Sequence, residues 1–570
     1  MPLNNDQTLK EQLGDHDSLF SLSCTYVTTN LYHAWCFLQG LDVSEKETVL
    51  EGVTELDGEI HCDSLKNLPE TMRFLSLSTT FNATLNTLNL PTSLRTLHFG
   101  EYFNQDLKAA TLPCNLRDLT FGGMFNQSFK GVTFPSSLQI LTLGRRFNQS
   151  LEHVTLPPNL ESLTFGNDFN QSLEDTQFPL TLKNLIFGAS FDQSLEHVIF
   201  PASLQTLKFA TNFNRTLERV TFPENLQTLT FGDAFSQSIE RLNWPCNLHS
   251  LTLGYNFNEH LERLILPDNL RSLTFGCSFN QSLEHVTLPH SLLSLTFGRD
   301  FDQSMEHVTL PQNLESLSFG YSFNQCLRKV IWPVNLQSLS LGHRFNKSLQ
   351  HVILPCNLRS LTFGFSFCQS MDDVMLPCNL QSLTFDVTFN QSLDNVILPD
   401  SLQSLILGFA FNRSIRNVTW PNNLQTLAFG YEFHQCLEGV SLPGSIASLT
   451  FGHDFNTSME NARLPSSLQS LTFGCSFNQS LENVSLPANL ESLTFGECFN
   501  QSLEHVILPD NLQNLVFGDR FNQSLENVTL PSNLHSLTFA ECFDQSLELV
   551  TLPSRLRSLL LKGTWVSCQE

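Results

Sequence analysis

The sequence predicts a mainly β solenoid of about 23 coils, built from a 22-residue unit, with a parallel sheet and little or no helix in the repeats. Phenylalanine recurs with the period of this unit from Phe81 to Phe543, and proline keeps the same period from Pro69 to Pro553. No insertion or deletion interrupts either series. A short fixed period of this kind is typical of a solenoid, in which each coil packs only against its neighbours.

The apolar spacing within one coil predicts strands. The unit 267–288 reads PDNLRSLTFGCSFNQSLEHVTL, and apolar residues stand two apart in its middle and again at its end. A spacing of two is strand periodicity, and no stretch carries the spacing of three, four and seven that a helix needs. We therefore expect a main strand around 272–275 and a second short extended segment around 286–288.

Glycine and proline predict where each coil turns. Glycine stands three residues before the periodic phenylalanine, as at Gly166, Gly276 and Gly474. This placement is typical of a turn that needs a positive φ angle. Proline lacks an N–H group and has a fixed φ angle, so we expect it to end the second segment.

The residue after each periodic phenylalanine predicts an asparagine ladder. It is usually asparagine, as at Asn104, Asn126, Asn280, Asn390 and Asn522. A buried turn has backbone polar groups that no sheet satisfies, and an asparagine side chain both donates and accepts hydrogen bonds. The exceptions are Asp192, Ser236, Asp302, Cys368, His434 and Asp544. Some copies match the N-glycosylation pattern, but stacked coils leave no room for a glycan on each one.

The unit GxxFNQSLExVxLPxNLxSL resembles the FNIP repeat of the leucine-rich-repeat superfamily. The resemblance covers residues ~69–567, and the one departure is that Leu, Phe or Trp precedes the proline where the family name implies Ile. It implies a leucine-rich-repeat-like solenoid that binds other proteins. Some members of the family carry an F-box or a kinase domain beside the repeats, and neither is evident in this sequence.

Three segments follow from the period. Residues 67–567 form one continuous solenoid, and 568–570 are a tail. Residues 1–66 lack the period, and their segment 29–40 has a helix-like apolar face, so we expect a partly helical cap over the end coil. A degenerate F-box-like adaptor is the alternative for this region. At the other end, Trp565 takes the periodic phenylalanine position and should complete the last coil.

Composition excludes several classes of protein. The chain has 55 Asp and Glu against 30 Lys and Arg, a formal net charge of −25, which disfavours nucleic acid as a partner. No apolar run is long enough to predict a membrane span. The N-terminus predicts no secretory signal, and 15 cysteines without one favour reduced thiols and a cytoplasmic location. No cysteine pair has zinc-site spacing, and no calcium motif is present, so we predict no metal and no cofactor.

Two surfaces are candidate interaction sites. The first is the solvent side of the main strand, which has a regular Ser-x-Thr pattern interrupted in a few coils. Its alternatives are a merely solvated face, a protein-docking face and an ice-binding hydroxyl array. The candidate residues are Ser272, Thr274, Ser294, Thr296, Ser360 and Thr362, with Lys208 and Ile406 as interruptions.

The second surface is an acidic stripe five residues after each phenylalanine. A solvated charged face is one interpretation, and a docking strip for a basic partner or for cations is the other. The following position often supplies His or Arg, which should offset part of the repulsion between the carboxylates. The residues of the acidic stripe are Glu174, Glu196, Glu218, Glu240, Glu262, Glu284 and Glu306.

Together these features predict a non-catalytic scaffold that binds proteins along an extended repeat surface, because catalysis needs different groups that converge in a pocket. We expect a monomer. The first alternative function is a substrate-recognition adaptor of a ubiquitin ligase that acts through residues 1–66. The second is a structural or ice-surface-binding protein.

Overall fold

The computed structural model describes residues 55–56, 68–85, 89–561 and 564–566. They fall into two compact units. Unit 1 ends at Gly276, and unit 2 comprises Cys277–Glu570 together with Leu261–Arg263. The described residues contain no α-helix, and the period of the sequence continues without a slip in both units.

Unit 1 contains a parallel sheet in which each strand pairs with the strand of the next coil. Strands from β2 to β11 follow the period of the sequence, one to a coil, whereas the short β1 lies outside it. The strands are β1 (Glu55–Leu56), β2 (Phe74–Ser76), β3 (Thr96–His98), β4 (Asp118–Thr120), β5 (Ile140–Thr142), β6 (Ser162–Thr164), β7 (Asn184–Ile186), β8 (Thr206–Lys208), β9 (Thr228–Thr230), β10 (Ser250–Thr252) and β11 (Ser272–Thr274).

Unit 2 repeats the same arrangement and ends differently. Its strands are parallel until β25, which pairs antiparallel to β24 and places Trp565 opposite Leu560. The strands are β12 (Ser294–Thr296), β13 (Ser316–Ser318), β14 (Ser338–Ser340), β15 (Ser360–Thr362), β16 (Ser382–Thr384), β17 (Ser404–Ile406), β18 (Thr426–Ala428), β19 (Ser448–Thr450), β20 (Ser470–Thr472), β21 (Ser492–Thr494), β22 (Asn514–Val516), β23 (Ser536–Phe539), β24 (Ser558–Leu561) and β25 (Thr564–Val566).

The end of unit 2 corrects one expectation. Trp565 does not complete a further parallel coil but lies in the antiparallel strand β25. A reversed strand at the end of a parallel sheet pairs with backbone groups that would otherwise face solvent. The predicted cap segment 29–40 lies outside the described residues.

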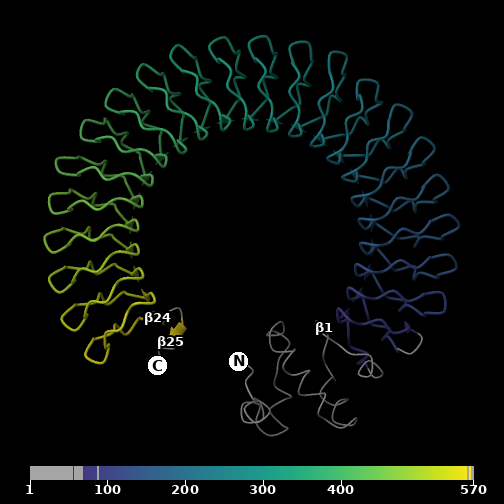
Figure 1. The fold of residues 1–570 in the computed structure, drawn as a ribbon, viewed down its shortest axis with the longest axis horizontal. Coiled ribbons are helices and arrows are strands. Elements are labelled where there is room, and N and C mark those ends of the chain that lie inside the picture. Colours follow the sequence, from purple (N-terminus) through teal and green to yellow (C-terminus); the bar gives the residue numbers. More distant parts are fainter. Residues whose placement is uncertain (1–54, 57–67, 86–88, 562–563, 567–570) are drawn as a thin grey trace, which may run out of the picture. The chain divides into compact units, whose positions relative to one another are not determined.

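Figure 1 shows that in each unit the strands lie along the concave edge of the stacked coils, while wide turns form the outer edge. The main strand is confirmed at Ser272–Thr274. The segment at 286–288 is not a strand, but Thr287 within it is an isolated β-bridge residue, and an isolated bridge also joins Ser441 and Arg463 in the equivalent segments. The coils fan apart toward the outer edge, which takes this segment beyond the reach of a regular ladder.

The core contains, beside columns of leucine and valine, two columns of mostly phenylalanine rings between the strand edge and the outer turns. Phe165 and Phe169 of one coil stack at 4.0 Å between ring centroids, and Phe169 stacks on Phe191 of the next coil at 5.9 Å. All three are buried. Offset stacking of nearly parallel rings is favourable, and it fixes each coil in register with the next.

The glycines have a different role from the one predicted. Among the described glycines, positive φ angles occur at Gly131 and Gly439, not at Gly166, Gly276 or Gly474. A Cβ atom added at Gly166 would lie 1.8 Å from the carbonyl oxygen of Gly144 in the preceding coil. Glycine is therefore favoured because successive coils approach one another closely at this point, and not because the backbone is left-handed, although Ser78, Ala210, Asp386 and Ala540 take the same position in other coils.

The asparagine ladder is confirmed. The Asn104 Oδ1 accepts hydrogen bonds from the backbone N–H of Asn126 at 2.8 Å and from the Gln127 Nε2 at 3.1 Å. Aspartate replaces asparagine without loss at Asp302, whose Oδ1 accepts the N–H of Asn324 at 2.8 Å. One side-chain oxygen thus connects each coil to two donors of the next coil.

Candidate functional site

The predicted acidic stripe lies on the outer turns. Each turn is closed by a backbone hydrogen bond, such as the one from the Val198 N–H to the Leu195 carbonyl at 3.1 Å. The serine before the turn also accepts a hydrogen bond from the glutamate N–H, as at Ser194 and Glu196. Most of these glutamates are exposed, and Glu240 and Glu306 are half-buried. In unit 1 the stripe contains Glu174, Glu196, Glu218 and Glu240, and in unit 2 it contains Glu262, Glu284 and Glu306.

Cations of the following coil partly neutralise this stripe, as the sequence predicts. The Arg219 Nη1 lies 2.8 Å from the Glu196 Oε1, and the Lys329 ammonium group contacts the Glu306 carboxylate in the same way. These hydrogen bonds lower the pKa of Glu196 and of Glu306 below its ordinary value, and they raise the pKa of Arg219 and of Lys329. Both pairs are solvated, so they tune the charge of the surface more than they stabilise the fold.

The predicted strand-face residues lie in parallel columns on the concave edge. Ser272 and Thr274 lie in β11 of unit 1, opposite Ser250 and Thr252 of β10. Their side chains are half-exposed, and the leucine between them is buried. The same pattern holds in unit 2 for Ser294 and Thr296 of β12 and for Ser360 and Thr362 of β15.

The two interruptions of this face lie in different units. Lys208 is exposed at the end of β8 in unit 1, and Ile406 is exposed at the end of β17 in unit 2. The described structure does not bring them into one site. Each presents one unlike side chain on a face of small hydroxyl residues.

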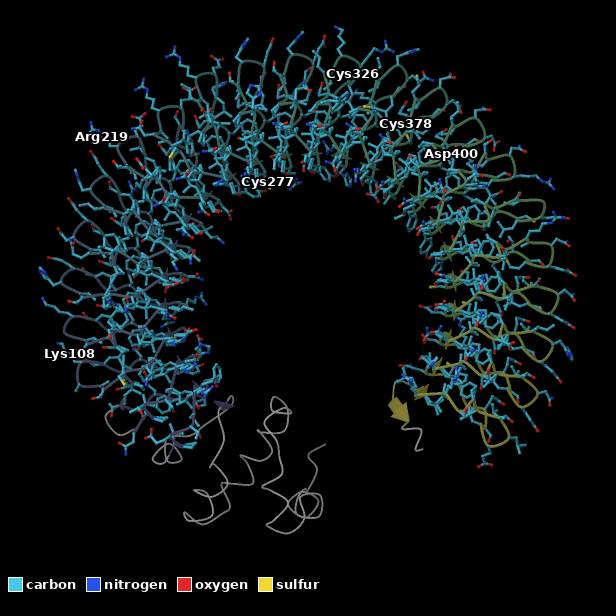
Figure 2. The ribbon with its side chains drawn as sticks, turned by 180° about the vertical axis from the view of Figure 1, so that it is seen from behind. Lys108, Arg219, Cys277, Cys326, Cys378 and Asp400 are labelled. Carbon is cyan, nitrogen blue, oxygen red and sulfur yellow. The ribbon has the colours of Figure 1, made fainter. Side chains whose placement is uncertain are left out.

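An exposed column of aromatic rings runs beside the strand face of unit 2. It occupies the turn that follows each strand, ten residues after the proline. Figure 2 labels Cys277, a member of the same column, near the strand edge, whereas Lys108 and Arg219 are labelled on the outer turns. We call this column the aromatic ladder, and it consists of Tyr321, His343, Phe365, Phe409, Tyr431 and His453.

The rings of the aromatic ladder stack face to face in two groups of three, with Val387 between them. Centroid separations are 4.2 and 4.6 Å in the first group and 4.4 and 4.1 Å in the second. The Tyr and Phe residues are between 37% and 43% exposed. The guanidinium groups of Arg299 and Arg344 each lie 5.4 Å from the centroid of the Tyr321 ring. Stacking and cation–π contacts hold the first group in place.

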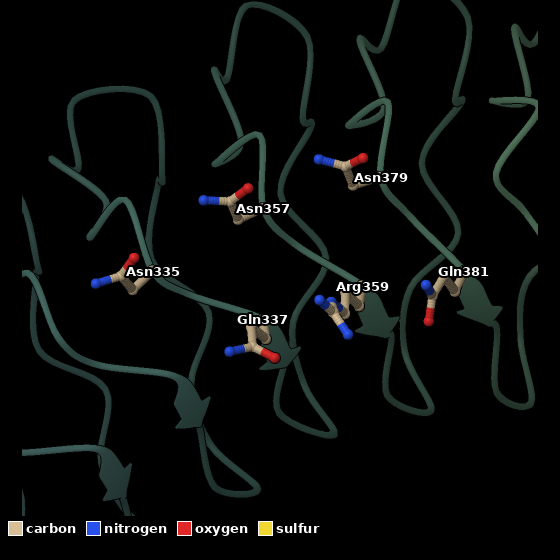
Figure 3. Close-up of a pocket in the computed structure, with 6 residues that line it drawn as sticks. All are labelled: Asn335, Gln337, Asn357, Arg359, Asn379 and Gln381. Atoms are coloured by element: carbon tan, nitrogen blue, oxygen red, sulfur yellow. The ribbon is translucent and has the colours of Figure 1, made fainter.

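A shallow polar groove borders the same strands on their other side (Figure 3). Its volume is about 340 Å³. The Asn357 and Asn379 side chains donate to backbone carbonyls of the preceding coil at 2.9 and 3.0 Å, which fixes one wall. The lining residues are Asn335, Gln337, Asn357, Arg359, Asn379 and Gln381.

The polar groove, strands β14–β16 and the first group of the aromatic ladder therefore lie on one surface of unit 2. Amide and guanidinium groups offer hydrogen bonds on one side, and ring edges offer apolar contact on the other. The groove has no paired acid and base and no nucleophile beside a base. The described residues include no group of three or more side chains suited to hold a metal ion.

The aromatic ladder was missed by the sequence analysis, although its signal is visible there. The column ten residues after the proline is small or polar through most of unit 1, with residues such as Gly123, Asn167 and Thr211. It becomes aromatic at Tyr321 and stays so in most coils to His453. A comparison of this column from coil to coil, in place of a consensus over all coils, would have found the change to aromatic residues.

The parallel solenoid and its asparagine ladder together define a leucine-rich-repeat protein. The FNIP Repeat model matches residues 81–124, 125–168, 169–212, 213–245, 243–278, 279–322, 323–366, 367–410, 411–454, 455–498 and 499–542. The chain therefore belongs to the FNIP repeat family.

One solved structure supports this assignment. The chain is similar to the crystal structure of CroV588, a novel circular leucine-rich-repeat protein, with 40% sequence identity and a TM-score of 0.76. That match covers 87% of this chain and 76% of the other. YopM from Yersinia enterocolitica WA-314 also matches, with 18% identity, a TM-score of 0.40 and coverage of 89% and 98%. No curated protein matches the chain. Among the described residues, no helix has the length and apolar character to cross a membrane.

Proposed function

We propose that the chain is a non-catalytic scaffold that docks other proteins on the concave edge of unit 2. The aromatic ladder beside strands β13–β19 is the observation that carries this proposal. Exposed apolar surface of this extent is uncommon on soluble proteins and typically marks a binding site. Aromatic residues and arginine are also the side chains that contribute most to protein interfaces.

The chemistry of the ladder favours a protein over a glycan or a nucleic acid. Sugars and bases bind ring faces, and here the faces are covered by neighbouring rings about 4 Å away. The ring edges remain, and they suit apolar side chains and carbonyl oxygens. The net charge of −25 also disfavours a phosphate backbone.

The polar groove extends this docking surface for a peptide backbone. The Gln337 and Gln381 amides and the Arg359 guanidinium lie along β14–β16 and offer several donors and acceptors. A partner whose apolar side chains pack on the ladder could place its backbone polar groups over these side chains. The half-exposed serines and threonines between the two lie within the same footprint.

We also propose a location in the cell, and we compare the two alternative functions with the structure. The described cysteines are free thiols, which supports a reducing, cytoplasmic location. The adaptor alternative rests on residues 1–66, nearly all of which lie outside the described part of the chain, so no observation favours it. The ice-binding alternative needs a flat hydroxyl array, and the strands of each unit lie on a concave edge.

Proximity labelling with the full chain tests the proposal. The ladder variant replaces Phe365, Phe409 and Tyr431 with serine, and the control variant replaces the isolated exposed Tyr102 and Tyr255 of unit 1 in the same way. We expect the ladder variant to lose a defined set of labelled proteins that wild type and control share. If all three chains label the same proteins, the ladder is not the docking surface.

A further inference from the structure

A second exposed apolar feature lies on unit 2, away from the strand face. The column two residues before each proline points outward, because its neighbours on either side point into the core, as Val352 and Leu354 do around Ile353. Four successive coils place a large apolar residue there, between 72% and 85% exposed. We call them the apolar stripe: Ile331, Ile353, Met375 and Ile397.

An uninterrupted run of large apolar residues in this column is particular to these coils, because Ile199 and Ile265 of unit 1 stand singly. In the rest of unit 2 the same column is mostly polar, with Ile507 as a single exception. The other residues are Thr287, Thr309, Thr419, Ser441, Arg463, Ser485, Thr529 and Thr551. Hydrogen-bonded strands lie about 4.8 Å apart and the coils fan apart here, so the four apolar side chains form a ridge of at least about 15 Å. A ridge of this kind is costly to leave in water, which indicates that another surface covers it.

The acidic stripe changes at the same coils. Six coils centred on the apolar stripe have mixed charges at the position of the acidic stripe. When the order of these six residues is reversed and set against the original order, opposite charges face one another. The residues, in chain order, are Glu306, Arg328, Gln350, Asp372, Asp394 and Arg416. Read backwards against itself, this order opposes Glu306 to Arg416, Arg328 to Asp394 and Gln350 to Asp372.

We propose that this face joins two copies of the chain in an antiparallel dimer. The twofold axis passes between the coils of Ile353 and Met375 and lies parallel to the chain direction of these segments. It places each column opposite the same column of the partner. It also reverses the order of the coils in the partner. Ile353 then packs on the partner's Met375, and Ile331 packs on the partner's Ile397. A twofold interface must be self-complementary, and this arrangement satisfies that condition in both the apolar and the charged columns.

The next column supports the same register. His351 and Asp373 are adjacent to Gln350 and Asp372, and both have positive φ angles, of 63° and 60°. The twofold axis brings His351 of one copy opposite the partner's Asp373. Complementarity ends one coil further out, where Glu284 would face the partner's Glu438, so the interface spans six coils.

The size of this patch predicts a dimer of moderate strength. Six coils have five intervals between them and span at least about 24 Å, and a patch of this length and only a few columns in width has an area at the small end of specific protein interfaces. The full chain should therefore change from monomer to dimer at concentrations on the order of 1 to 100 µM. This state differs from the monomer expected from the sequence alone.

Sedimentation equilibrium of the full chain across that range tests the dimer, with a reductant present because Cys356 and Cys378 beside the stripe are exposed. Ile353→Ser with Met375→Ser should weaken association more than about tenfold. Ile507→Ser is the matched control, since Ile507 has the same column and exposure, and it should have no effect. A chain that stays monomeric throughout overturns the proposal, and so does an Ile507 variant that weakens association equally.

Charge reversal tests the register. Arg328→Asp and Asp394→Arg should each weaken the dimer by about tenfold, because each places like charges opposite one another. The two changes in one chain restore opposite charges across the axis, and association should return close to that of wild type. A double variant that is weaker than either single variant contradicts the antiparallel arrangement.

Discussion

At the residue scale, contacts between equivalent positions of successive coils hold the solenoid together. The ladder asparagines were expected to satisfy the turns, and they do so through one oxygen. The glutamine that follows most of the ladder positions, such as Gln127 and Gln523, was not expected as the second donor. Glycine was recognised as special, yet its role depends on the carbonyl of a neighbouring coil, a contact one full repeat away in the sequence that local turn patterns do not report.

A side chain at Gly474 should destabilise the chain, because the adjacent coils of Gly452 and Gly496 also have glycine there and approach closely. A Cβ atom there would lie 1.9 Å from the Gly452 carbonyl oxygen, and both groups are backbone, so the coils must separate. Gly474→Ala should lower the free energy of unfolding by about 1–3 kcal/mol in urea denaturation. At Gly444 an added Cβ meets nothing within 4 Å, so Gly444→Ala should be neutral or stabilise by about 0.4–1 kcal/mol. Equal losses at both sites would refute the close-approach explanation.

Asn500 should be replaceable by aspartate but not by alanine. Its Oδ1 accepts the Asn522 N–H at 2.9 Å and the Gln523 Nε2 at 3.0 Å. Asn500→Ala leaves both donors unpaired and should cost about 1–3 kcal/mol, whereas Asn500→Asp keeps the acceptor and should cost less. Hydrogen exchange of the Asn522 amide measures the difference. Equal protection in the two variants would show that the oxygen is not what holds this amide.

At the element scale, the coil is the unit of structure. Period-two apolar spacing located the main strands correctly, because the buried leucine at the centre of each strand fixes the face that the strand presents. The second segment was predicted from the same spacing and is not a strand. Local spacing determines which side chains point inward. A strand also needs a neighbouring segment at hydrogen-bonding distance, and the fanning of the coils moves the neighbouring segments too far apart.

Removal of one whole coil should be tolerated. Deletion of residues 465–486 joins Leu464 to Pro487 and restores every column, so folding should persist with a small shift in melting temperature. Deletion of only 465–475 leaves strands, rings and ladder out of register and should abolish cooperative unfolding. Circular dichroism melts compare the two. If both deletions melt like wild type, register does not hold the coils together.

The ion pair between Glu306 and Lys329 should stabilise the outer turns within a defined pH window. Its hydrogen bond lowers the pKa of Glu306 from 4.5 and raises the pKa of Lys329 from 10.5. The contribution is therefore fully present between those two values, and it is lost as the pH falls through the lowered pKa or rises through the raised one. Lys329→Gln should melt slightly below wild type at pH 7, and this difference should shrink as the pH falls through the lowered pKa of Glu306. A difference that persists at lower pH would assign the effect to packing.

At the scale of the whole molecule, the fold could be predicted and the site could not. The many coils average out into one consensus, and the consensus determines the core, the strands and the family. The docking surface lies in departures from that consensus, at the aromatic ladder, and no consensus position points to it. Whether a side chain that differs from the consensus is exposed depends on the geometry of its turn, and the repeat pattern does not determine that geometry.

Site-specific photocrosslinking tests the central claim, that partners dock on the concave edge of unit 2, most directly. Benzoylphenylalanine placed in the full chain at Phe409 keeps an aromatic ring in the ladder, and the same residue at Tyr255 or at Glu438 provides matched exposed controls. We predict covalent adducts with other proteins at position 409 and few at 255 or 438. Adducts of equal yield at all three positions, or none at 409, would contradict the claim.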